Sequence, residues 1–146
     1  MIKHIEVAIS QLDVQEAPKG SNWGEPVQSY LKSVGITFPA SWCMAFVYWC
    51  CKEAYGKENK LFKTGGVLKQ WQSVNPKHKF KTPLPGDIFI QDHGKGLGHT
   101  GFVEKVQGDQ IFTIEGNTND TGSREGYEVC RRFRKISSCI GFIRIV

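Results

Sequence analysis

In the first half of the chain, apolar residues recur at steps of three and four, the period of an amphipathic helix. This spacing predicts one helix over 2–12 and a second that starts just after Pro26 and stops at Gly35. A third helix, with Ser41 as N-cap and an end near Tyr55–Gly56, is apolar nearly all round, which predicts deep burial. A short fourth helix is expected over 67–71.

From Pro83 onward, short β-rich runs replace the helical pattern. Gly, Asp and Asn turns such as Gly108–Asp109 and Gly122–Ser123 separate predicted strands over 88–90, 100–106, 111–114, 127–133 and 140–146. The stretch 77–81 is expected to be only a loop. Helices first and strands later, without alternation, predict an α+β fold with an antiparallel sheet. A length of 146 residues fits a single domain over 1–146.

Composition adds exclusions more than identifications. The chain has 19 Lys+Arg against 14 Asp+Glu, and a formal charge of +5. Its longest apolar run, 42–51, is too short to span a bilayer, so no stable membrane insertion is expected. The N-terminus offers no secretory hydrophobic region, which predicts synthesis in the cytoplasm.

The densest basic stretch is 131–135. Strand alternation directs Arg132 and Arg134 to one face, and a solvated edge strand protected by charge explains them. Attraction to an anionic polymer is a second reading. No recognition motif accompanies the charge, so nucleic acid is not an expected partner.

The cysteine count, 5, is odd and excludes a complete internal disulfide framework. No CxxC pair exists, and neither a metal nor another cofactor is predicted. Cys43 lies at the start of the predicted buried helix, where the helix dipole and unpaired N–H groups favour a thiolate and can hold an oxyanion. The alternative is that Cys43 is one more small buried hydrophobe.

A thiolate nucleophile needs a base, and 4 histidines compete. His99 differs from the others because it opens a predicted strand between Gly98 and Gly101, which allow a ligand or another element close to the backbone. Either Glu115 or Asn117, at the end of the next strand, is able to orient the imidazole. Taken singly, each of these residues also has an ordinary structural explanation.

Four motifs together resemble the CHAP family, the cysteine, histidine-dependent amidohydrolases/peptidases of the papain-like NlpC/P60 group. They are Ser-Trp-Cys-Met-Ala-Phe-Val-Tyr-Trp-Cys at 41–50, Pro-Gly-Asp-Ile at 85–88, Gly-His-Thr-Gly-Phe-Val at 98–103 and Ile-Glu-Gly-Asn at 114–117. The resemblance runs from about Glu16 to Arg144.

The resemblance implies a papain-like fold, with the N-terminal helices packed on a C-terminal antiparallel sheet. It implies Cys43 as the nucleophile, His99 as the general base, and Glu115 with Asn117 as the groups that orient the histidine. Some members bind calcium in an Asp-rich loop ahead of the cysteine, but 21–25 holds no Asp cluster, so no metal is expected. Loop proximity alone suggests that Glu16 and Asn22 line the substrate cleft or complete the oxyanion hole. Trp23 is a candidate for shaping a sugar- or peptide-binding groove, but a core position is the favoured reading, because large aromatic residues are mostly buried for packing.

The usual substrate of the family is peptidoglycan, so a cell-wall amidase or endopeptidase is the expected function. A catalytically silent binding module, or an amidase acting on a non-wall amide such as a glutathionyl-polyamine conjugate, are the alternatives. An endolysin, an injected toxin with a cognate inhibitor protein as its partner, and a housekeeping wall enzyme all fit. In the first two cases the protein acts on the wall after release or injection.

Overall fold

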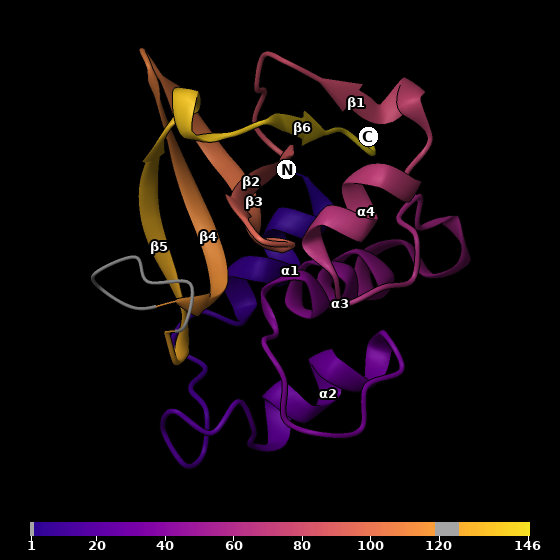
Figure 1. Ribbon diagram of the computed structural model, residues 1–146, viewed down its shortest axis with the longest axis vertical. Coiled ribbons are helices and arrows are strands. Elements are labelled where there is room, and N and C mark those ends of the chain that lie inside the picture. The colour runs from indigo at the N-terminus through magenta and orange to yellow at the C-terminus, as the bar shows by residue number, and fades with distance from the viewer. Residues whose placement is uncertain (1, 119–125) are drawn as a thin grey trace.

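The computed structural model describes residues 2–118 and 126–146, so the predicted turn at Gly122–Ser123 lies outside the described residues. Within them, helices precede strands along the chain as the periodicity predicts (Figure 1). The helices are α1 (Lys3–Ser10), α2 (Glu25–Ser33), α3 (Cys43–Tyr55) and α4 (Val67–Ser73). Short 3₁₀ turns lie at Gly56–Glu58, Pro76–His78 and Ile136–Ser138.

The start of α3 differs from the prediction. Trp42, with φ −123° and ψ 16°, occupies the N-cap position without a side-chain cap, so Ser41 is not the N-cap. Pro26 is also the second residue of α2 rather than the residue before it. Trp42 is fully buried at the start of α3, whereas Glu25 and Pro26 at the start of α2 are exposed. Each boundary differs from its prediction by one or two residues, at the helix ends where local signals are weakest.

A six-stranded antiparallel sheet has the order β1-β6-β2-β3-β4-β5. Its strands are β1 (Lys79–Phe80), β2 (Ile88–Gly94), β3 (Leu97–Gln107), β4 (Gln110–Thr118), β5 (Glu128–Lys135) and β6 (Gly141–Ile143). The expectation of a mere loop over 77–81 is wrong, because Lys79 and Phe80 pair with Ile143 and Phe142.

The helices cover one side of the curved sheet, with α3 against β3 and β4 and with α1 and α2 against α3 (Figure 1). The main hydrophobic core lies in this layer, and every side chain of α3 from Cys43 to Val47 is buried in it. A second, smaller core of Phe89, Val103, Ile111 and Phe142 lies among the strands. The structure confirms the predicted α+β fold, with N-terminal helices packed on an antiparallel sheet.

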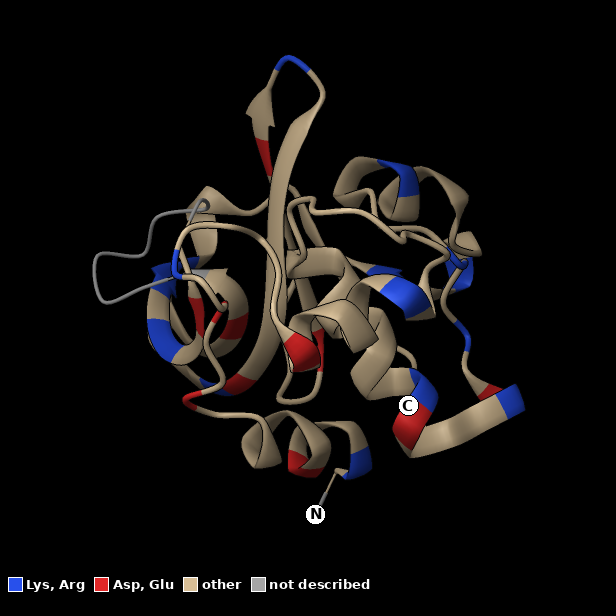
Figure 2. Ribbon diagram, turned by 90° about the horizontal axis from the view of Figure 1, so that it is seen from below, with Lys and Arg blue, Asp and Glu red and all other residues tan. Residues whose placement is uncertain are grey.

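Charged residues are distributed around the molecule, with acidic positions among the basic ones (Figure 2). Among the described residues, no helix is long and apolar enough to cross a membrane.

Candidate active site

Cys43 is the first residue of α3, and its side chain is only 3% exposed. The first N–H groups of a helix have no acceptor within the helix, so this thiol lies beside backbone donors at the positive end of the helix dipole. Cys50 and Cys51 lie on later turns of α3, fully buried, and burial raises the pKa of both thiols. All five cysteines are free thiols, but only Cys43 combines the helix start with a histidine neighbour.

His99 lies in β3 with no solvent exposure, between glycines that admit other elements. A Cβ at Gly98 would lie 3.0 Å from Val67 of α4, and one at Gly101 would lie 2.7 Å from Cγ of Glu115. The two glycines therefore let a helix and a catalytic candidate approach the strand. This confirms the expectation that the glycines on either side of His99 let another element of the protein approach the backbone.

The hydrogen bond from His99 to Glu115 determines which ring nitrogen is left for the thiol. Nε2 of His99 lies 2.8 Å from Oε1 of Glu115, in a site that excludes solvent from both side chains. An ionised carboxylate only accepts, so Nε2 carries a proton and Nδ1 is the nitrogen available to Cys43. Nδ1 has no hydrogen bond of standard geometry within 2–118 and 126–146, yet the thiol lies near enough to act on the ring.

The charge state of His99 follows from its two neighbours. Burial lowers the pKa of the imidazole, but hydrogen bonding and charge interaction with Cys43 and Glu115 outweigh it and raise the pKa to about 9. The ring is therefore an imidazolium at neutral pH. A cationic ring beside a cysteine at a helix N-terminus brings a proton donor and a nucleophile together.

Glu115 is fully buried, and described donors surround its carboxylate. Besides His99, Thr113 donates to Oε2 at 2.6 Å, and Arg134 donates to Oε2 at 2.8 Å and to Oε1 at 2.5 Å. Burial opposes ionisation of Glu115, but the hydrogen bonds and charges of Arg134 and His99 lower its pKa to about 2. The carboxylate is ionised at every pH at which the protein is expected to work.

Arg134 is the residue of this site that sequence reasoning missed. Strand alternation placed it on the same face as Arg132, but a solvated role for Arg134 is wrong, because its side chain is 16% exposed and paired with Glu115. A basic residue two positions after another on a strand was the available signal. Nothing local to β5 revealed that a buried carboxylate of β4 lies within its reach.

Asn117 is fully buried two residues after Glu115, near the buried row formed by Cys43, His99 and Glu115. It has a left-handed backbone, with φ 57°, at an irregularity in the pairing of β4 with β5. Regular strand alternation from Glu115 to Asn117 does not hold at this point. Glu115 makes the hydrogen bond with Nε2 of His99, which favours Glu115 as the orienting group. A contribution of Asn117 stays a prediction.

Glu16 holds the residue that precedes Cys43. Its carboxylate is buried and accepts from Nε1 of Trp42 at 2.7 Å and from the backbone N–H of Gly20 at 2.9 Å. Trp42 in turn lies against Gly116, where a Cβ would come within 2.8 Å of its ring. Glu16 therefore holds Trp42, which packs the start of α3 against β4.

Asn22 and Trp23 lie in the loop before α2. Asn22 has a left-handed backbone, with φ 57°, and Trp23 is half-buried against the main core. Their suggested contact with substrate, like that of Glu16, stays a prediction.

Replacing Glu16 with Ala is expected to lower the free energy of unfolding by about 1–3 kcal/mol, because it leaves a buried indole N–H without its acceptor. Chemical denaturation measures the change. Glu53→Ala, which removes an exposed glutamate of α3, is the control and is expected to change stability by less than about 0.5 kcal/mol. Equal effects of the two substitutions would contradict an anchoring role for Glu16.

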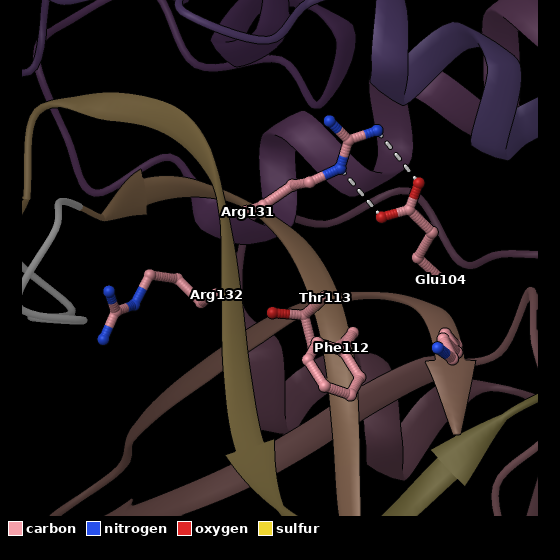
Figure 3. Close-up of a pocket in the computed structure, with 6 residues that line it drawn as sticks. Glu104, Phe112, Thr113, Arg131 and Arg132 are labelled. Atoms are coloured by element: carbon pink, nitrogen blue, oxygen red, sulfur yellow. Dashed lines mark hydrogen bonds and ion pairs between the residues drawn. The ribbon is translucent and has the colours of Figure 1, made fainter. Parts of the chain in front are cut away.

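A hollow of about 460 Å³ lies over β3, β4 and β5, lined by Glu104, Lys105, Phe112, Thr113, Arg131 and Arg132 (Figure 3). Arg131 and Glu104 of its lining form an ion pair, so its charges are partly satisfied within the protein. Chemistry is better located by the buried row of Cys43, His99 and Glu115 than by the size of a hollow. Among the described residues, no group of three or more His, Cys, Asp or Glu is placed to hold a metal ion.

A thiol at a helix N-terminus, packed through that helix on an antiparallel sheet that supplies a histidine and a carboxylate, is the arrangement expected of the papain-like fold. The chain belongs to the CHAP domain family, whose model matches residues 34–117, a range that includes Cys43, His99, Glu115 and Asn117. None of the curated proteins compared with the chain matches it.

Among solved structures, the chain is similar to the crystal structure of Ly7917, with a TM-score of 0.59 and 16% sequence identity. The match covers 97% of this chain and 60% of Ly7917, so the chain spans about 60% of the length of that structure. A second structure, of Ly7917 with the hydrolyzing product of MDP, matches with a TM-score of 0.49, 14% identity and coverage of 97% and 61%. At 16% identity the likeness to Ly7917 shows that the two chains share a fold.

Proposed function

We propose that the protein is a peptidoglycan hydrolase that cleaves an amide bond of the stem peptide or cross-bridge with Cys43 as its nucleophile. The observation that carries the proposal is the buried row in which Glu115 accepts from Nε2 of His99, leaving Nδ1 to Cys43. Membership of the CHAP domain family supports the substrate class. The scissile bond is either the one between muramic acid and L-alanine or one within the peptide.

In the first half of the reaction, the sulfur of Cys43 attacks the carbonyl carbon of the amide, and the C=O electron pair moves to the oxygen. Backbone N–H groups at the start of α3 stabilise this oxyanion. When the intermediate collapses, the C–N bond breaks and the His99 imidazolium gives the Nδ1 proton to the leaving amine. The products are a free amine and a thioester on Cys43.

In the second half, neutral His99 removes a proton from water through Nδ1, and the resulting hydroxide attacks the thioester. The C–S bond breaks, a carboxylic acid leaves, and the thiolate–imidazolium pair is restored. Glu115 holds the same ring nitrogen throughout, because Nε2 stays protonated in both forms of the ring. Its role is to orient the imidazole and to stabilise its cationic form.

Digestion of purified sacculi followed by mass spectrometry of the released fragments tests the proposed function. Amidase action is expected to release peptides with a free L-alanine amine, and endopeptidase action is expected to release shortened or unlinked peptides still attached to sugar. Intact sacculi that bind the protein would instead indicate a silent binding module. Hydrolysis of a glutathionyl-polyamine conjugate with no effect on sacculi would move the substrate outside the wall.

A further inference from the structure

β5 carries two arginines, and each of them donates two hydrogen bonds to a carboxylate. Arg131 donates to Glu104 at 2.9 and 3.0 Å, and Arg134 donates to Glu115 at 2.8 and 2.5 Å. The pairs are alike in chemistry and differ in burial. The side chains of Arg131 and Glu104 are 54% and 26% exposed, whereas those of Arg134 and Glu115 are 16% and 0% exposed.

The two pairs lie on opposite faces of the sheet. Figure 3 shows Arg131 and Arg132 leaving β5 in opposite directions, with Arg131 turned to Glu104. Arg134 follows Arg132 by one strand repeat and therefore shares its face. On that face the register pairs Glu115 with Cys130 and Ile111 with Arg134, so the long arginine side chain reaches diagonally along β4 to the carboxylate.

Burial makes the countercharge of Glu115 important during the reaction. A carboxylate without solvent is stable as an anion only when charged or hydrogen-bonding groups compensate its lost hydration. His99 is one such group, but it gives up its charge when it protonates a leaving amine. Arg134 keeps its charge at all working pH values, and its hydrogen bonds help to lower the pKa of Glu115.

Arg134 also limits how Glu115 can turn. Its two donors and the Thr113 hydroxyl bind both carboxylate oxygens, so the plane of the carboxylate is fixed by donors other than His99. A carboxylate held in this way directs the Nε2–H of His99 along one line, which leaves Nδ1 available to Cys43.

We propose that Arg134 is a positioning residue of the active site, which holds Glu115 ionised and correctly turned while His99 alternates between its two protonation states. The inference rests on the proposed function for its assignment of His99 as the base. It does not depend on which amide is cleaved.

The test compares Arg134→Gln and Arg134→Lys with the wild-type protein, and uses Arg131→Gln as the matched control from the other pair. Two pH profiles are measured: kcat/KM for hydrolysis of sacculi, and the rate at which iodoacetamide alkylates Cys43, followed on the Cys43 peptide by mass spectrometry. Thermal unfolding of each variant is recorded, and rates are taken where all of them are folded.

For Arg134→Gln we expect kcat/KM at pH 7 to fall by about 10- to 100-fold, the usual effect of removing a group that orients a reacting residue. Without Arg134, Glu115 takes up a proton at a higher pH than in the wild-type protein. The acid limbs of the activity profile and of the alkylation profile are therefore also expected to move to higher pH. Arg134→Lys keeps the charge but not the paired donors, so its kcat/KM and pH profiles are expected to lie between those of the wild-type protein and Arg134→Gln. Arg131→Gln is expected to stay within about twofold of wild type.

Unchanged rates and profiles in Arg134→Gln would overturn the proposal. So would a lower rate with an unshifted profile, since that pattern indicates a purely structural arginine. If Arg134→Gln does not fold, an unshifted profile in Arg134→Lys overturns it equally. If wild-type protein leaves sacculi and other amides intact while the alkylation profile still shifts in Arg134→Gln, the proposed function fails and the positioning role stands.

Discussion

Hydrolysis of sacculi is expected to fall by at least about four orders of magnitude when Cys43 is replaced by Ala. The substitution removes the atom that forms the acyl intermediate, and neither His99 nor the N–H groups of α3 can supply a substitute for it. The fold is expected to survive, because Cys43→Ala removes one sulfur atom at the edge of the core, at a cost of about 1 kcal/mol. Release of soluble wall fragments measures the activity, and circular dichroism checks the fold.

A matched control comes from the same helix. Cys51 is fully buried, and burial raises the pKa of its thiol, so Cys51→Ala is expected to cost about 1–2 kcal/mol of stability and to keep kcat/KM within about twofold. Wall digestion by Cys43→Ala at the wild-type rate would show that Cys43 is not the nucleophile.

The same substitution has a readout that needs no substrate. Cys43 is one of the groups that raise the pKa of His99 to about 9. Cys43→Ala is therefore expected to lower that pKa, which NMR titration of the imidazole measures. A His99 pKa that does not move would mean that the thiol and the ring do not interact.

The parts of the fold that local patterns predicted are those in which local and tertiary preferences agree. The apolar surface of α3 extends nearly all round, and the structure buries it between the other helices and the sheet. The prediction failed where a distant partner decides. β1 has only two residues and exists because β6, from the end of the chain, pairs with it. The start of α3 is set by Trp42, which Glu16 holds from another loop.

The candidate site divides in the same way. Cys43 and His99 were predicted because each carries a local signal, a helix start in one case and bracketing glycines in the other. To distinguish Glu115 from Asn117 as the hydrogen-bond partner of His99 required the orientation of the imidazole ring, which only the packed structure gives. Arg134 was assigned to solvent because alternation fixes the face of a side chain but not what lies on that face. A second strand must be in register before a buried carboxylate and a distant arginine meet.

Glu115→Gln is expected to reduce kcat/KM by about two to four orders of magnitude, since an amide cannot stabilise the imidazolium as a carboxylate does. It is also expected to lower the free energy of unfolding by about 3 kcal/mol, because the mostly buried Arg134 loses its countercharge. Glu104→Gln breaks the equivalent exposed pair with Arg131 and is expected to change stability by less than about 1 kcal/mol. Denaturant unfolding and wall digestion measure the two effects.

The pH dependence of stability shows whether the effect of Glu115→Gln on the free energy of unfolding is electrostatic. The pKa of Glu115 falls from 4.5 to about 2 on folding, so its contribution is complete above pH 4.5 and is lost as the pH falls through about 2. The pKa of His99 rises from 6.5 to about 9, so its contribution is complete below pH 6.5 and is lost as the pH rises through about 9. Both are therefore fully present only between pH 4.5 and 6.5.

In Glu115→Gln the loss of stability at acid pH that is due to residue 115 is expected to vanish. The loss of stability at alkaline pH is expected to shift to lower pH, because the His99 pKa falls without the carboxylate. Unfolding curves measured from pH 3 to 10 test this, with Glu104→Gln expected to keep the wild-type profile. A Glu115→Gln profile parallel to the wild-type one would show that Glu115 contributes only packing. The carboxylate would then have no electrostatic hold on the histidine, and the assignment of this row as the catalytic centre would lose its main support.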